Sequence, residues 1–141
     1  MLLAALLFLQ ATTIVRHGTP FTVGPKPVTI TLDAAKAKSK LVRAAKSQNV
    51  VLQIEGITAA KPPGFIAAVY VGGTRVGEVA LYAFDQPQTI ALGVNAAVAK
   101  ALRAGTSVPV RFVPESGLAN QPAHVEAPIR ISAVSLVIER K

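Results

Sequence analysis

The chain has 141 residues, no cysteine and a formal net charge of +8. This length fits a single domain, and a composition that is 51% hydrophobic and 16% charged predicts that most of it folds. The lack of cysteine excludes disulfides, thiolate nucleophiles and sulfur-ligated metal sites. Two histidines, His17 and His124, are too few to assemble a multi-histidine metal centre from one chain.

Residues 1–9 form an apolar run, much shorter than the roughly 20 residues that a membrane-spanning helix needs. The run resembles the apolar part of a secretory signal peptide, although no basic residue precedes it and the first one is Arg16. Ala11 and Thr13 offer small residues for cleavage. Two interpretations stay open: a signal peptide, which implies a secreted or periplasmic protein, or a remnant or linker, which implies a cytoplasmic one.

Residues 16–26 are dense in glycine and proline, which predicts an extended linker. Residues 1–26 are therefore predicted to be an apolar segment and a linker with one short strand at 21–23, and residues 27–141 the folded domain. From residue 28 to 32 apolar and polar side chains alternate, which predicts a half-buried strand.

Further strands follow the same alternation. They are predicted at residues 50–55, 65–71, 75–84, 89–92 and 108–112, and at 129–139 with a break near Ala133 where the parity of the apolar residues changes. Gly72 and Gly73 predict a tight hairpin turn.

The apolar period changes to that of a helix at residues 94–104. Asn95 is expected to cap the start of this helix, and Gly105 to end it in the left-handed conformation. The predicted fold is all-β: a β-sandwich or barrel-like domain of about seven strands with this one short helix.

Half of the net charge comes from one segment, residues 33–46, which has five basic residues against one acid. No aromatic residue lies between them, so the stacking platforms of single-strand binders are missing and nucleic-acid binding is not expected. The segment is predicted to be a solvated loop or helix face that offers electrostatic contacts. Its basic residues are Lys36, Lys38, Lys40, Arg43 and Lys46.

No catalytic or metal-binding pattern stands out in the sequence. The seven acidic residues are isolated from one another, so none forms an obvious acid–base pair. Ser116 and His124 share a loop, but the sharp turn and the third group of a hydrolase site are missing. We therefore predict no catalytic residues, no metal ligands and no cofactor in this chain.

Taken in order, the strand motifs resemble the C-terminal domain of tyrosinases and polyphenol oxidases. In plant members the third strand carries Lys-Phe-Asp-Val, of which residues 66–69 keep only the valine. The basic segment lies where plant members have a long lysine-rich loop, which favours a loop. The motifs that carry the resemblance are residues 27–32, 51–57, 63–71, 76–84, 92–94, 108–114 and 129–139.

The resemblance implies a β-sandwich that covers the entrance to a two-copper site in a separate helical domain. Copper would then be held only by that catalytic partner, on the same or another chain. The chain itself would be non-catalytic and would keep the enzyme latent, or aid its folding or copper loading. Copper-handling cysteines of some relatives have no counterpart here.

The long loop after the strand at 108–112 offers two candidates for contact with such a partner, Leu118 and His124. An alternative stays open: a stand-alone, secreted β-sandwich binding module whose basic segment contacts anionic surfaces. The sequence leaves the oligomeric state open.

Overall fold

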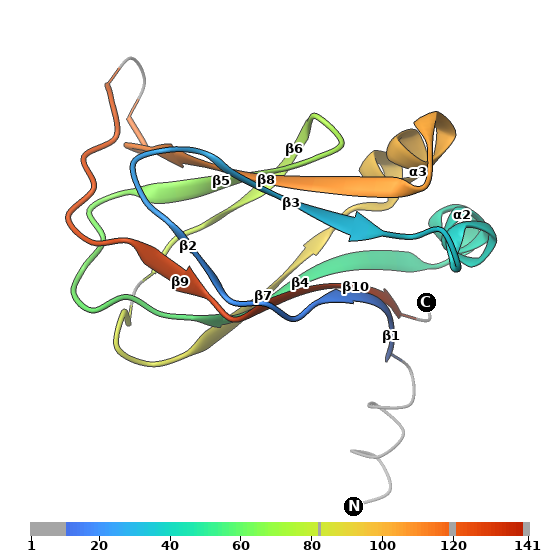
Figure 1. The fold of residues 1–141 in the computed structure, drawn as a ribbon, viewed down its shortest axis with the longest axis horizontal. Helices are drawn as coiled ribbons and strands as arrows, with labels where there is room; N and C mark the ends of the chain where they lie inside the picture. The colour runs from blue at the N-terminus through green and yellow to red at the C-terminus, as the bar shows by residue number, and fades with distance from the viewer. Residues whose placement is uncertain (1–10, 82, 119–120, 140–141) are drawn as a thin grey trace, which may run out of the picture.

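A computed structural model describes residues 11–81, 83–118 and 121–139 of the chain. The described part forms ten strands and two helices, and two four-stranded antiparallel sheets pack face to face (Figure 1). The predicted β-sandwich is confirmed, and the sheets do not close into a barrel. The number of strands and helices was predicted too low, at about seven and one.

The first sheet, named here the β4 sheet, has the order β1-β10-β4-β7. Its strands are β1 (Ala11–His17), β10 (Ala133–Glu139), β4 (Asn49–Ile57) and β7 (Gln88–Gly93). The alternation expected in β4 is present, because Val50, Leu52 and Ile54 are fully buried in the core. The segment expected to be a linker contributes the edge strand β1, which pairs with β10 along its length.

The second sheet, the β8 sheet, has the order β3-β8-β5-β6. Its strands are β3 (Val28–Asp33), β8 (Ser107–Glu115), β5 (Ile66–Val71) and β6 (Thr74–Val79). Val108, Val110 and Phe112 of β8 point into the core and are fully buried. The core therefore lies between the two sheets, as burial of one apolar face from each sheet requires.

The predicted turn between β5 and β6 is present, and both of its glycines have positive φ: 56° at Gly72 and 86° at Gly73. The strand after it is shorter than predicted, because it ends at Val79 and not at Phe84. Val79 pairs with Ala67 close to the start of β5, so the partner strand runs out there. The chain then crosses to the β4 sheet, where β7 begins.

A short two-stranded ribbon, β2 (Phe21–Val23) with β9 (Ile129–Ile131), lies beside the sandwich. The strand predicted at 21–23 is thereby confirmed, and the ring of Phe21 packs 5.3 Å from that of Phe112. The predicted break near Ala133 is also confirmed, because Ser132 separates β9 from β10. The change of parity lets the chain leave the ribbon and enter the β4 sheet with apolar residues facing the core in both strands.

Two helices, α2 (Lys38–Ser47) and α3 (Asn95–Ala104), pack together at one end of the sandwich (Figure 1). The basic segment is therefore largely a helix, which decides between the loop and the helix face that the sequence left open; the resemblance had favoured the loop. The residues that this helix buries are Leu41 and Ala44. The helix expected at 94–104 is confirmed within one residue.

The prediction that Asn95 caps α3 is wrong, because no side chain caps the start of this helix. The side chain of Asn95 instead joins three elements. Its Nδ2 donates to the carbonyl oxygens of Ala45 at 3.1 Å and Gln48 at 2.7 Å, and its Oδ1 accepts the N–H of Val50 at 2.9 Å. The side chain thus satisfies backbone groups at the end of α2 and the start of β4. The prediction for Gly105 is also wrong, since its φ of 174° is extended backbone.

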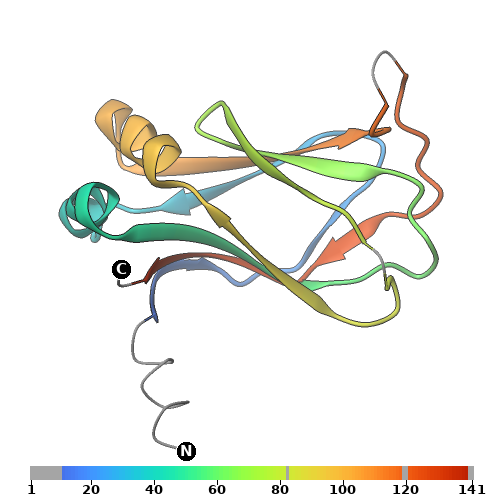
Figure 2. The ribbon, with the colours of Figure 1, turned by 180° about the vertical axis from the view of Figure 1, so that it is seen from behind.

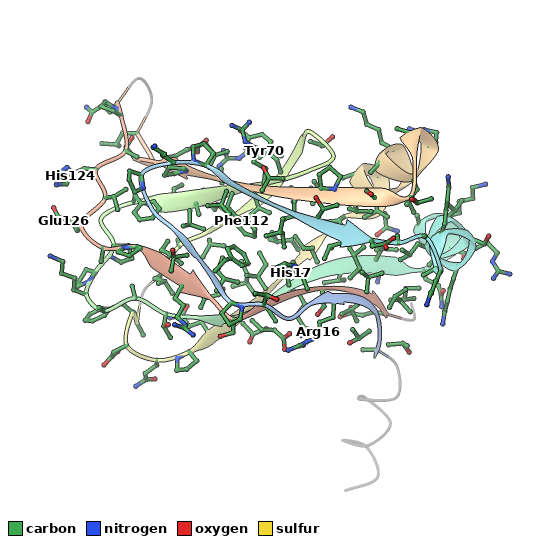
Figure 3. The ribbon with its side chains drawn as sticks, viewed as in Figure 1. Arg16, His17, Tyr70, Phe112, His124 and Glu126 are labelled. Carbon is green, nitrogen blue, oxygen red and sulfur yellow. The ribbon has the colours of Figure 1, made fainter. Side chains whose placement is uncertain are left out.

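On the outer face of the β4 sheet, the side chains of β10 are covered. All residues from Ala133 to Ile138 are buried, although every second one points away from the core. Arg16 of β1 forms an ion pair with Glu55 of β4 at 2.6 Å, so its side chain crosses β10, which lies between these strands (Figure 3). Ser135 on this face is 1% exposed, and its Oγ has no hydrogen-bond partner among the described residues.

Candidate partner-facing site

The end of the sandwich opposite the two helices is built from loops (Figure 2). We name it the loop end and define it as residues 62–65, before β5, with residues 116–118 and 121–127, after β8. The backbone N–H of Glu126 donates to the carbonyl oxygen of Pro63 at 2.7 Å. The two segments are distant in the sequence and are held against each other by this contact.

Gly64 allows the two segments to approach closely. Its φ is +78°, and a Cβ added there would lie 2.7 Å from Cγ of Glu126 and 3.0 Å from the carbonyl oxygen of His124. Any other residue would have to adopt a left-handed backbone and displace the neighbouring loop. The glycine therefore fixes where residues 124–126 run.

Leu118 is the large hydrophobic residue that stands out as exposed in the described part of the chain, with 64% of its surface accessible. Its backbone is held by Ser116, whose Oγ accepts the Leu118 N–H at 3.0 Å and lies 2.9 Å from the Leu118 carbonyl oxygen. Gly117, with φ of +81°, completes this turn. The turn fixes the main chain while the leucine side chain stays in solvent.

A single exposed leucine is ordinary on a protein surface. This one differs because its main chain is already ordered, so less conformational entropy is lost when the side chain is buried by a partner. The sequence prediction that Leu118 faces a partner is not tested by the structure itself, but the geometry is suited to it.

His124, the second predicted contact residue, lies at the same end of the molecule (Figure 3). Its side chain is 82% exposed, and Nε2 lies 2.7 Å from Oε1 of Glu126, which makes an ion pair when the imidazole is protonated. An exposed pair of this kind adds little stability. The imidazole therefore remains available for contacts with another molecule.

A hollow of about 490 Å³ lies beside the Ser116 turn and is lined by Leu118 together with Ile66 and Pro122. Charged groups line it as well. The Arg75 guanidinium lies 2.8 and 3.0 Å from the two carboxylate oxygens of Glu115. The hydrogen bond to Glu115, followed by that to Tyr70, raises the pKa of Arg75, which is already charged at neutral pH.

The charged groups of this hollow are paired with one another, since Arg75 also reaches Glu78 at 3.3 Å. No group of three or more His, Cys, Asp or Glu residues that could hold a metal occurs among residues 11–81, 83–118 and 121–139. No helix in that same part of the chain is long and apolar enough to cross a membrane. For contact with another molecule, the loop end presents the hollow beside Ser116, the exposed side chain of Leu118 and the imidazole of His124 paired with Glu126.

The five predicted electrostatic residues lie on α2 and just before it. The helices are at the end of the sandwich opposite the loop end (Figure 1). The structure therefore does not bring the two predicted sets together. It does bring Lys100 and Arg103 of α3 to the helical end, because α3 packs on α2. The sequence pattern gives no sign that these two residues join the basic segment.

Comparison with known proteins gives a fold and no family. No family model and no curated protein matches the chain. Among solved structures, a recombinantly expressed latent aurone synthase, a polyphenol oxidase, matches with a TM-score of 0.62 at 15% identity. The match covers 86% of this chain and 26% of the polyphenol oxidase chain.

Latent aurone synthase from a natural source matches at 18% identity with a TM-score of 0.57 and the same coverage. A different protein, BuGH86 in complex with neoagarooctaose, matches at 9% identity with a TM-score of 0.57, covering 91% of this chain and 18% of that one. The chain thus spans about a quarter or less of the length of these three chains. At these identities the matches show a shared β-sandwich fold.

Proposed function

We propose that this chain is a non-catalytic capping domain of the tyrosinase and polyphenol oxidase type. It covers the entrance to the dicopper site of a catalytic partner domain, on the same or a separate chain, and keeps that enzyme latent. The observation that carries the proposal is Leu118, held exposed on an ordered turn of a fold that latent polyphenol oxidase shares.

In this proposal Leu118 is the side chain that enters the substrate opening. Burying a leucine contributes roughly 1.5–3 kcal/mol, which is enough to hold a cap in place when other contacts add to it. His124 and Glu126 contact the rim of the opening, because the contact between residues 124–127 and Pro63 fixes their main chain. Copper stays with the partner, and the cap acts by excluding the phenol from it.

The first step of the test is to identify the partner. We expect the coding sequence next to this one, or continuous with it, to encode a helical chain with six copper-binding histidines. Co-expression of that chain with this one should give a complex that co-purifies, with a low rate of catechol oxidation. An oxidase of unchanged activity, with no complex at micromolar concentrations, would contradict the proposal.

The second step tests Leu118 itself. Leu118→Asp should weaken inhibition by about 10- to 100-fold, which corresponds to the free energy of burying the leucine. Leu118→Met keeps an apolar side chain of similar volume, so it is the matched control and should inhibit within a few-fold of the wild type. Equal loss in both variants would mean that the shape of the turn matters and that Leu118 does not enter the opening.

A further inference from the structure

The helical end carries a basic surface that the two helices build jointly. Asn95 fixes α3 against the end of α2, as described above. This surface has seven basic residues. Six of them are exposed and one, Lys38, is half-buried. Two acidic residues, Asp33 and Glu139, lie at the same end. The basic residues are Lys36, Lys38, Lys40, Arg43, Lys46, Lys100 and Arg103.

The basic residues of the helical end make the distribution of charge over the molecule strongly uneven. Outside the helical end, the described residues carry six basic side chains against five acidic ones, and several of these are paired with each other. None of the seven basic residues of the helical end takes part in an ion pair within the described residues. Most of the net charge is therefore concentrated on one exposed surface, which attracts a polyanion or an anionic lipid surface.

The surface between the helices is not purely charged. A hollow of about 420 Å³ lies there, lined by the apolar residues Val42, Ala45 and Leu102 and by basic residues of both helices. Apolar surface flanked by lysine and arginine is typical of proteins that lie on a bilayer, where the apolar part meets the acyl boundary and the basic part meets the headgroups.

The chain also joins an apolar run to this same end. Ala11, the first described residue, pairs with Glu139, and Glu139 pairs with Asn49, two residues beyond the end of α2. The described part of the chain therefore begins at the basic end, and residues 1–9, which precede it in the sequence, are all apolar. Apolar contact adds to the electrostatic attraction of a basic surface for anionic lipids, so the two features act in the same direction.

We infer that the helical end is a docking surface for an anionic bilayer, with the basic side chains of α2 and α3 on the lipid headgroups. This surface lies at the opposite end from Leu118, so a membrane and a capped partner can be engaged at the same time. The inference does not depend on the proposed capping function.

Vesicle flotation tests this with the full chain and two lipid compositions, phosphatidylcholine alone and equal parts of phosphatidylcholine and phosphatidylglycerol. We expect at least about tenfold tighter binding to the anionic vesicles, and loss of that preference at high salt. Equal affinity for both compositions would overturn the inference.

The most specific test concerns α3. If only the basic segment around α2 bound the vesicles, Lys100 and Arg103 would not contribute. Lys100→Gln with Arg103→Gln should weaken binding to anionic vesicles by about 20- to 30-fold, at roughly fivefold per charge near the surface. The matched control, Lys61→Gln with Arg130→Gln, removes the same charges from exposed positions away from the helices. It should change binding by no more than about twofold, and equal losses in both variants would contradict a localised surface.

A soluble polyanion is the competing ligand, and two arms separate it from a membrane. Deleting residues 1–10 should lower the affinity for both vesicle types while the preference for phosphatidylglycerol stays, because the helices are unchanged. Heparin should compete only weakly. If heparin binds tightly and the deletion leaves vesicle binding unaltered, the surface serves a polyanion and the membrane inference is wrong. Circular dichroism checks that every variant is folded.

Discussion

The two ends of the sandwich are held together in different ways. At the helical end, the half-buried side chain of Asn95 on α3 bonds to the end of α2 and to the start of β4. Distant parts of the chain therefore depend on it. At the loop end, the ordered turn depends on local bonds of Ser116 and on close backbone contact at Gly64. The helical end therefore contributes to global stability, and the loop end presents an exposed surface to other molecules.

The largest effect is expected for Asn95→Ala. The change removes three hydrogen bonds and leaves two carbonyls and one N–H at a half-buried site without this partner. We expect a loss of about 2–4 kcal/mol in the free energy of unfolding, measured by urea denaturation. A loss under about 0.5 kcal/mol would mean that water replaces the side chain and that the helical end does not depend on Asn95.

Gly64→Ala should come next, because it forces a Cβ toward Glu126 and His124 at a positive φ. We expect the protein to be destabilised by about 1–3 kcal/mol. Gly73→Ala is the matched control: its φ is also positive, but nothing lies within 4 Å of the added Cβ. If the two variants lose equal stability, backbone strain alone accounts for the effect and the contact between the loop segments contributes nothing.

Ser116→Ala tests the loop end with a smaller effect. The turn loses the hydroxyl that binds the N–H of Leu118, but the site is exposed and water can replace it. Unfolding free energy should fall by no more than about 1 kcal/mol. Amide hydrogen exchange at Leu118 should become faster while exchange in β4 stays the same. Equal acceleration in both places would show that the turn is coupled to the core.

The smallest effect is expected on the outer face of the β4 sheet. Ser135→Ala removes a buried hydroxyl that has no partner among the described residues, so the variant should be as stable as the wild type or more stable by up to about 1 kcal/mol. Thermal denaturation measures this. Destabilisation by more than about 1 kcal/mol would show that a water molecule satisfies the hydroxyl.

Much of the sandwich could be predicted because its strands alternate between apolar and polar residues, as in β3 and β4, and because glycine pairs mark turns. For the segment of α2 the sequence left a loop and a helix open, since only Leu41 and Ala44 are buried and lysines dominate the pattern. β1 was hidden by the glycines and prolines that follow it, and only its pairing with β10 defines it.

The candidate sites were predictable to a similar extent. Leu118 and His124 could be placed in one loop from the sequence, but the bonds that fix the turn depend on its folded form. Lys100 and Arg103 join the basic surface through helix packing, about 60 residues from the basic segment, a distance at which the sequence pattern gives no signal. The role of Asn95 was not predictable for the same reason. Asparagine is a common helix cap, but here its side chain bonds to α2 and β4, which are distant in the sequence.

One titration tests the central claim that the loop end caps the partner enzyme and the helical end does not. Catechol oxidation by the histidine-bearing catalytic chain is measured against increasing wild type, Leu118→Asp, and the variant with Lys100→Gln and Arg103→Gln. Our account predicts saturable inhibition by the wild type and by the helical-end variant at similar concentrations, with Leu118→Asp needing at least about tenfold more. Inhibition that survives Leu118→Asp and is lost in the helical-end variant would contradict it.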